Sequence, residues 1–132
     1  MQTSREPAMT DPRPKHLDLV HIRLPVPAVV SILHRVSGAA LFLLLPFLLY
    51  LLHASLDSPD SYVRMRAMIE QPLVKLVLIG LLWAYLHHFC AGIRFLALDL
   101  HWGIALQPAR RNAWAVLAVS LALTLVLGVW LW

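Results

Sequence analysis

The stretch GAALFLLLPFLLYLL, residues 38–52, decides the fold of this chain. It contains no charged residue, and its leucines would point in every direction around a helix instead of forming one apolar stripe. A helix in water needs a polar face, so the stretch predicts a helix that crosses a membrane. Pro46 lies inside it, and we expect a kink there, because membrane helices tolerate a proline whose freed carbonyl is satisfied by neighbours.

Two further apolar runs follow, and each is long enough to cross a bilayer core, which takes roughly 20 residues. Together the three runs predict helices over about residues 28–53, 72–100 and 113–132. Hydrophobic residues make up 60% of the chain and charged residues 14%, a balance that excludes a soluble domain. We therefore expect an all-α membrane protein with three transmembrane helices in residues 28–132.

The basic residues predict the orientation of these helices, because loops rich in Lys and Arg stay on the inner side of a membrane. By this rule the N-terminus lies inside, residues 1–27 form a cytoplasmic segment, and the C-terminus lies outside. The basic residues form no patch with interleaved aromatic residues, so nucleic acid is not an expected partner. Those assigned to the inner side are Arg5, Arg13, Lys15, Arg23, Arg35, Arg94, Arg110 and Arg111, and those assigned to the outer side are Arg64, Arg66 and Lys75.

The first polar cluster is SILHRVSG, residues 31–38, at the inner end of the first predicted helix. Ser31, His34 and Arg35 lie three and four residues apart, so they share one face. An ionisable group inside a membrane costs on the order of 2 to 3 kcal/mol on insertion scales, so these residues indicate a function. The alternative is that Arg35 only extends to the interface and His34 is an ordinary interfacial residue.

The second polar cluster is HHFCAGIR, residues 87–94, in the inner half of the second predicted helix. His88 and Gly92 share a face, so a flat cofactor such as a haem could coordinate the imidazole and lie against the glycine. Consecutive helical residues point about 100° apart, so His87 and His88 cannot both face one iron. The alternative is that either histidine only hydrogen-bonds to a neighbouring helix. The one cysteine, Cys90, offers neither an internal disulfide nor a cysteine-rich metal site.

The two clusters are expected at similar depth, because the first helix runs outward and the second runs inward. A rise of 1.5 Å per residue puts Arg35 and His88 roughly 9 to 12 Å from the inner ends of their helices. At that level Arg35 could pair with a haem propionate or hydrogen-bond a quinone carbonyl, and Ser31 could do the latter.

These motifs resemble those of the cytochrome b membrane anchor subunits of bacterial succinate dehydrogenase. The resemblance covers the chain from about Arg13 to the end. One position departs from the family pattern: the residue after Gly-Ile-Arg is often His in the family and is Phe95 here. The matching elements are Arg13-Pro14, Leu17-Asp18-Leu19, Ile22-Arg23, Pro25, the Ser-x-x-His-Arg-x-Ser-Gly stretch from Ser31 to Gly38, and His88 followed by Gly92-Ile93-Arg94 and Asp99.

The resemblance implies that His88 is an axial ligand of haem b and that Ser31 and Arg35 line a ubiquinone site. It also implies that His34, Arg35 and Arg94 lie near the haem propionates. No other histidine of this chain is well placed as a second ligand, so we expect that ligand from a second anchor subunit that shares the haem.

The implied complex also contains an iron–sulfur subunit and a flavoprotein subunit at the cytoplasmic face of a bacterial inner membrane. It would carry electrons from succinate to ubiquinone, in the tricarboxylic acid cycle and aerobic electron transport. This chain carries no cysteine set for a cluster and no glycine-rich nucleotide motif, so it would not act on succinate by itself.

The alternative function is a small transporter or an assembly subunit whose buried His and Arg residues work without a haem. Three helices are few for a transport path, and the sequence has no visible inverted repeat or pair of broken helices.

Overall fold

The computed structural model describes residues 24–132. Most of the expected cytoplasmic segment 1–27, and the matching elements from Arg13 to Arg23, lie outside the described residues. The described part of the chain is entirely helical apart from its connections.

Three long helices dominate the structure: α1 (Val26–Asp57), α3 (Pro72–Asp99) and α4 (Leu106–Leu131). Each is long and apolar enough to cross a membrane, as the sequence predicted. α1 extends past both ends of the expected range 28–53, and α4 begins well before residue 113. A helix can continue beyond the apolar core of a bilayer, so the apolar runs give its membrane part and not its ends.

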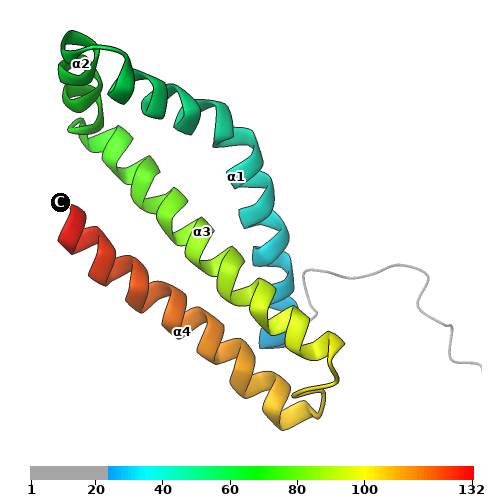
Figure 1. Ribbon diagram of the computed structural model, residues 1–132. Coiled ribbons are helices and arrows are strands. Elements are labelled where there is room, and N and C mark those ends of the chain that lie inside the picture. The colour runs from blue at the N-terminus through cyan, green and yellow to red at the C-terminus, as the bar shows by residue number, and fades with distance from the viewer. Residues whose placement is uncertain (1–23) are drawn as a thin grey trace, which may run out of the picture.

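The three helices run up and down beside one another, with α3 in contact with both α1 and α4 (Figure 1). The beginning of α1 and the connection between α3 and α4 lie at one end of the molecule, and α2 and the end of α4 lie at the other. This arrangement is the one that three successive crossings require.

Small residues let α3 approach its neighbours closely. Ala91 of α3 and Ala113 of α4 are fully buried, and together with Val30 and Val116 they form the apolar core. Helices in a membrane associate through such close packing, because lipid gives no hydrophobic drive for helix association.

The first helix changes direction partway along, between its cyan and green parts in Figure 1. Pro46 lies inside α1, where its ring removes one backbone hydrogen bond. The bend is the kink expected from the sequence.

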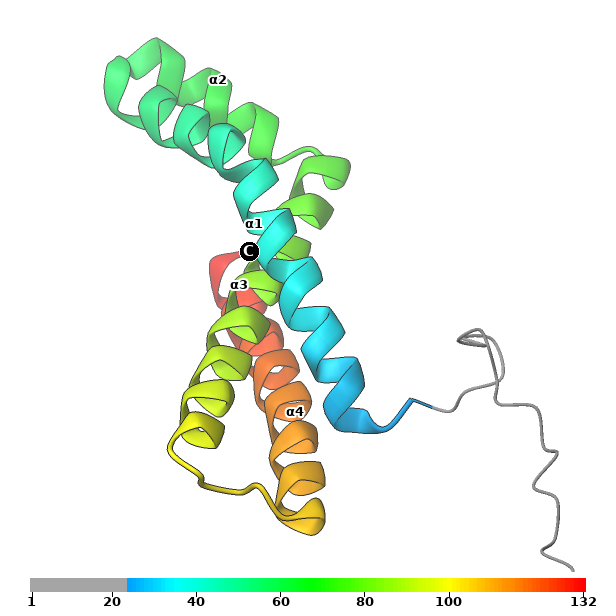
Figure 2. The same cartoon turned by 90° about the vertical axis from the view of Figure 1, so that its right-hand side faces the viewer.

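A fourth helix, α2 (Pro59–Ile69), was not predicted. It runs back along the last turns of α1 (Figure 2). Ser58 and Ser61 cap its first turn reciprocally, each side-chain oxygen accepting from the other residue's backbone N–H, and Pro59 is preorganised for a helix start. The Ser61 hydroxyl also donates to the Ala54 carbonyl over 2.8 Å, which ties α2 to α1.

The end of α3 is closed by two backbone hydrogen bonds, from Trp102 to Ala97 and from His101 to Leu98, both 2.9 Å. This pairing requires a left-handed residue after the helix, and His101 adopts it with φ 64°. The connection to α4 turns again at Gly103, where φ is 76° and a Cβ would lie 2.6 Å from the Asn112 amide nitrogen.

Candidate functional site

The two polar clusters of the sequence meet between α1 and α3. The rings of His34 and His88 are stacked, with centroids 4.1 Å apart and planes 9° from parallel. Arg35, next to His34, therefore lies at the level of His88, as the helix-depth argument predicted.

The His88 imidazole is held by the backbone of α1. Its Nδ1 lies 3.0 Å from the His34 carbonyl oxygen and 3.3 Å from the Ser37 hydroxyl, which itself donates to the same carbonyl over 2.9 Å. A carbonyl only accepts, so Nδ1 is assigned as the protonated nitrogen of the neutral ring. That tautomer leaves the lone pair of Nε2 available to a ligand.

Gly38 supplies the space that His88 occupies. A Cβ at Gly38 would lie 2.8 Å from Cε1 and 3.2 Å from Nδ1 of His88. Real Cβ contacts are essentially never this short, so His88 could not keep its position beside an alanine at residue 38. Gly92, expected to leave room for a cofactor, faces His34, and a Cβ there would lie 3.9 Å from His34 Nε2 in ordinary contact.

Ser37 and Gly38 belong to the first polar cluster of the sequence, but the sequence alone predicted no role for either residue. The signal was present, since both lie three and four residues after His34 and therefore on its face of the helix. Their function depends on the helix that crosses at that point, which spacing alone does not reveal.

His87 has a different environment from His88. Its side chain is 0% exposed, and neither ring nitrogen has a hydrogen-bond partner in the part of the chain that the structure describes. The ring packs against Trp83, with centroids 5.2 Å apart, and lies near the backbone of Val30 without forming a bond of good geometry. It shares this buried stripe with Ala84 and Ala91, which lie three residues before it and four residues after it.

Ser31 and Arg35 lie on α1 close to His34, and Arg35 faces the surface of the three helices. Ser31 is half-buried and Arg35 is exposed, whereas His34 turns toward α3. The three residues are therefore adjacent, but they do not point at one spot within this chain. A ligand of Arg35 would approach from outside the three helices.

Arg94 faces α4, whereas His88 faces α1. It is 7% exposed, its Nη2 reaches the Ala109 carbonyl of α4 at 3.5 Å, and its guanidinium lies 5.5 Å from the centre of the Phe95 ring. Phe95 in turn meets the edge of His34, with centroids 5.1 Å apart. Arg94 and His34 thus both contact the Phe95 ring.

The comparisons with known proteins agree on one family. The succinate dehydrogenase/fumarate reductase transmembrane subunit family matches residues 9–127. The chain is 38% identical over 125 residues to the succinate dehydrogenase cytochrome b556 subunit of Coxiella burnetii, covering 94% of this chain and 100% of that protein.

Two more distant relatives extend this similarity. The cytochrome b556 subunit of Paracoccus denitrificans is 30% identical over 114 residues, or 86% of this chain and 88% of that protein. The succinate dehydrogenase 2 membrane subunit SdhC of Mycobacterium tuberculosis is 34% identical over 98 residues, or 73% of this chain and 70% of that protein. The chain therefore belongs to the family of succinate dehydrogenase/fumarate reductase transmembrane subunits.

Proposed function

We propose that this chain is the haem b-binding membrane anchor of a succinate dehydrogenase, and that it helps to form the site where ubiquinone is reduced. Membership of the family displaces the alternative of a small transporter or an assembly subunit. The observation that carries the proposal is the orientation of His88, whose Nδ1 faces a backbone carbonyl. Histidines that bind metals characteristically donate their other ring N–H in this way.

The residues between α1 and α3 fit a haem at His88 better than at His87. His88 is partly exposed and its Nε2 is free to coordinate, whereas the fully buried His87 could meet a porphyrin only if the helices separated. The name cytochrome b556 carried by the relatives agrees with a haem of b type.

The second axial ligand is proposed to come from another anchor subunit. α1 is the least covered helix, since 6% of its most apolar window is buried within the chain against 28% for α3. A partner helix packed on α1 would cover apolar side chains and meet the His34–His88 pair from its open side. The haem, when bound there, would supply one-electron storage between the two chains.

Ubiquinone is proposed to bind beside Ser31 and Arg35. The exposed guanidinium of Arg35 can donate a charge-assisted hydrogen bond to a quinone carbonyl, and the Ser31 hydroxyl can donate a second, neutral one. His34, between them and His88, would lie near the haem propionates together with Arg35. Arg94 is the third residue proposed near the propionates, and its contact with Phe95 would also support that ring against His34.

The iron–sulfur and flavoprotein subunits are proposed to sit at the end of the molecule where α1 begins. The eight basic residues assigned to the inner side put that end in the cytoplasm of a bacterium, with the protein in its inner membrane. Electrons from succinate would then arrive on the side of the membrane nearest Ser31 and Arg35.

The ligand assignment predicts that His88→Leu abolishes or greatly alters the b-type optical spectrum of the purified complex, while His87→Leu leaves it nearly intact. The two variants remove the same imidazole from adjacent positions, so each is the control for the other. Reduced-minus-oxidised spectra at equal protein concentration measure the outcome. If only the His87 variant loses the spectrum, the haem ligand is His87 and the assignment to His88 is wrong.

The quinone assignment predicts that Arg35→Ala lowers quinone reduction by about 10- to 100-fold, the range expected for a lost charge-assisted hydrogen bond. Ser31→Ala should lower it by less, about 2- to 10-fold. Succinate oxidation by a soluble artificial acceptor should survive in both variants. If both activities fall together in an intact complex, Arg35 acts in assembly and not at the quinone.

The orientation predicts where reporter fusions are active. A reporter placed after Trp132 should show a periplasmic location, and a reporter inserted within residues 100–105 should show a cytoplasmic location. The reverse pattern would place Ser31 and Arg35 at the leaflet away from the electron-donating subunits, and the mechanism would fail with the topology.

A further inference from the structure

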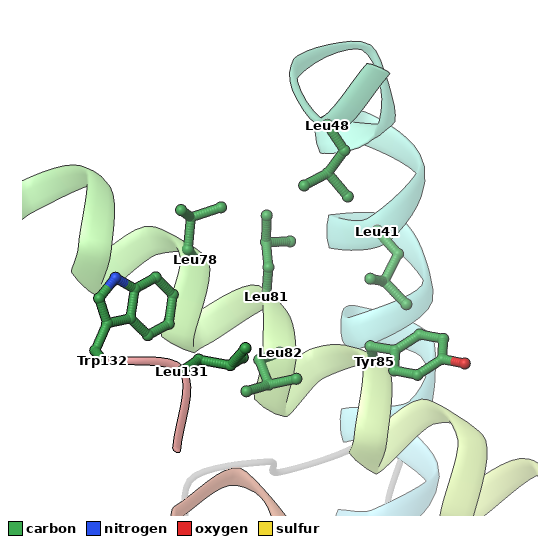
Figure 3. A pocket seen from close by; sticks show the side chains of 8 residues that line it. All are labelled: Leu41, Leu48, Leu78, Leu81, Leu82, Tyr85, Leu131 and Trp132. Carbon is green, nitrogen blue, oxygen red and sulfur yellow. The ribbon is translucent and has the colours of Figure 1, made fainter. Parts of the chain in front are cut away.

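Two apolar grooves that the proposed function does not use lie toward the end of the molecule where α4 ends. The first, with a cavity volume of about 300 Å³, lies between α1 and α3 beside the end of α4. Figure 3 shows leucines of α1 and α3 facing one another across it, with Leu131 and Trp132 at one side. Its principal lining residues are Leu41, Leu48, Leu78, Leu81 and Trp132.

The second groove lies between α3 and α4 and is also lined by Trp132, with a cavity volume of about 430 Å³. Ile79, Gly128 and Val129 line it. Its hydroxyl group, from Thr124, already donates to the Ser120 carbonyl over 2.7 Å. The groove thus offers apolar surface and no free hydroxyl donor.

A cation lies beside the aromatic residue that the two grooves share. The Lys75 ammonium lies 5.7 Å from the centre of the Trp132 ring, which lines both grooves. Lys75 precedes Leu78 by about one helical turn, so it lies beyond the apolar lining, near the beginning of α3. Lysines at such positions extend their ammonium group to the headgroup level of a bilayer.

The dimensions fit a lipid chain. Along α3 the first groove runs from Leu78 to Tyr85, about 10 Å at 1.5 Å per residue. Half of a bilayer hydrocarbon core is about 15 Å thick, so the groove follows most of one leaflet. Figure 3 shows the Tyr85 hydroxyl pointing away from the leucines, which keeps the deep end of the groove apolar.

We propose that these two grooves bind one anionic phospholipid, with one acyl chain on each side of Trp132 and the phosphate beside Lys75. Two apolar grooves that share one aromatic side chain match two chains joined at one headgroup, and the cation at their junction matches its negative charge. The proposed headgroup position at Lys75 is 13 residues from His88, and its test measures lipid retention instead of the haem spectrum or quinone reduction.

Native mass spectrometry of the whole complex in nanodiscs tests the proposal, with dioleoyl phosphatidylglycerol and dioleoyl phosphatidylcholine as probes. The wild-type complex should retain phosphatidylglycerol in preference. Lys75→Ala should weaken that retention about fivefold, the effect of about 1 kcal/mol expected for one basic residue at a membrane surface, and Lys75→Arg should restore it. Arg66→Ala, which removes another cation of the same end that is already paired with Glu70, should leave retention unchanged.

A pair of glycines tests the groove itself. A Cβ added at Gly128 or at Gly80 would meet nothing within 4 Å, so both positions open onto free space, but only Gly128 lines a groove. Gly128→Leu should displace the lipid and Gly80→Leu should not. Equal retention by wild type, Lys75→Ala and Gly128→Leu would overturn the proposal, and so would crosslinks showing a partner subunit's helix seated in the grooves.

Discussion

The hydrogen bond from the His88 imidazole of α3 to the His34 carbonyl of α1 is the interaction on which the rest of the site depends. It fixes the protonated nitrogen of the ring, and the stacked His34 ring fixes its plane. Gly38 permits both, because any side chain there would occupy the space of the imidazole. The backbone of one helix thus orients the side chain of another, and the crossing of α1 and α3 determines which histidine can hold a cofactor.

The polar groups of α3 contact different neighbouring helices. His88 turns toward α1, Arg94 turns toward the Ala109 carbonyl of α4, and His87 is enclosed between them. The proposed lipid site at Lys75 is 13 residues from His88, about 20 Å along the helix. The cofactor and the lipid headgroup are therefore proposed at opposite ends of the molecule, and each would add contacts to a chain that covers little of its own apolar surface.

Much of the fold was predictable, because membrane helices are apolar all round over a length that the bilayer sets. The kink at Pro46 also followed from local chemistry. α2 was missed because it is short and polar, although Ser58 and Pro59 mark its start. The roles of Ser37 and Gly38, and the turn of Arg94 away from His88, depend on which residues of two helices meet. Such contacts lie far apart in the sequence, and spacing within one helix does not determine them.

The most direct test of the account is the optical spectrum and haem content of a Gly38→Ala variant of the complex, compared with Gly80→Ala. Alanine favours a helix over glycine by about 1 kcal/mol, so neither change should weaken its own helix. At residue 80 the added methyl group meets nothing within 4 Å, whereas at residue 38 it would lie 2.8 Å from His88. The account predicts a lower haem content or an altered b-type spectrum for Gly38→Ala and a wild-type spectrum for Gly80→Ala. Identical spectra and haem contents for the two variants would contradict the claim that α1 holds His88 in place as the haem ligand.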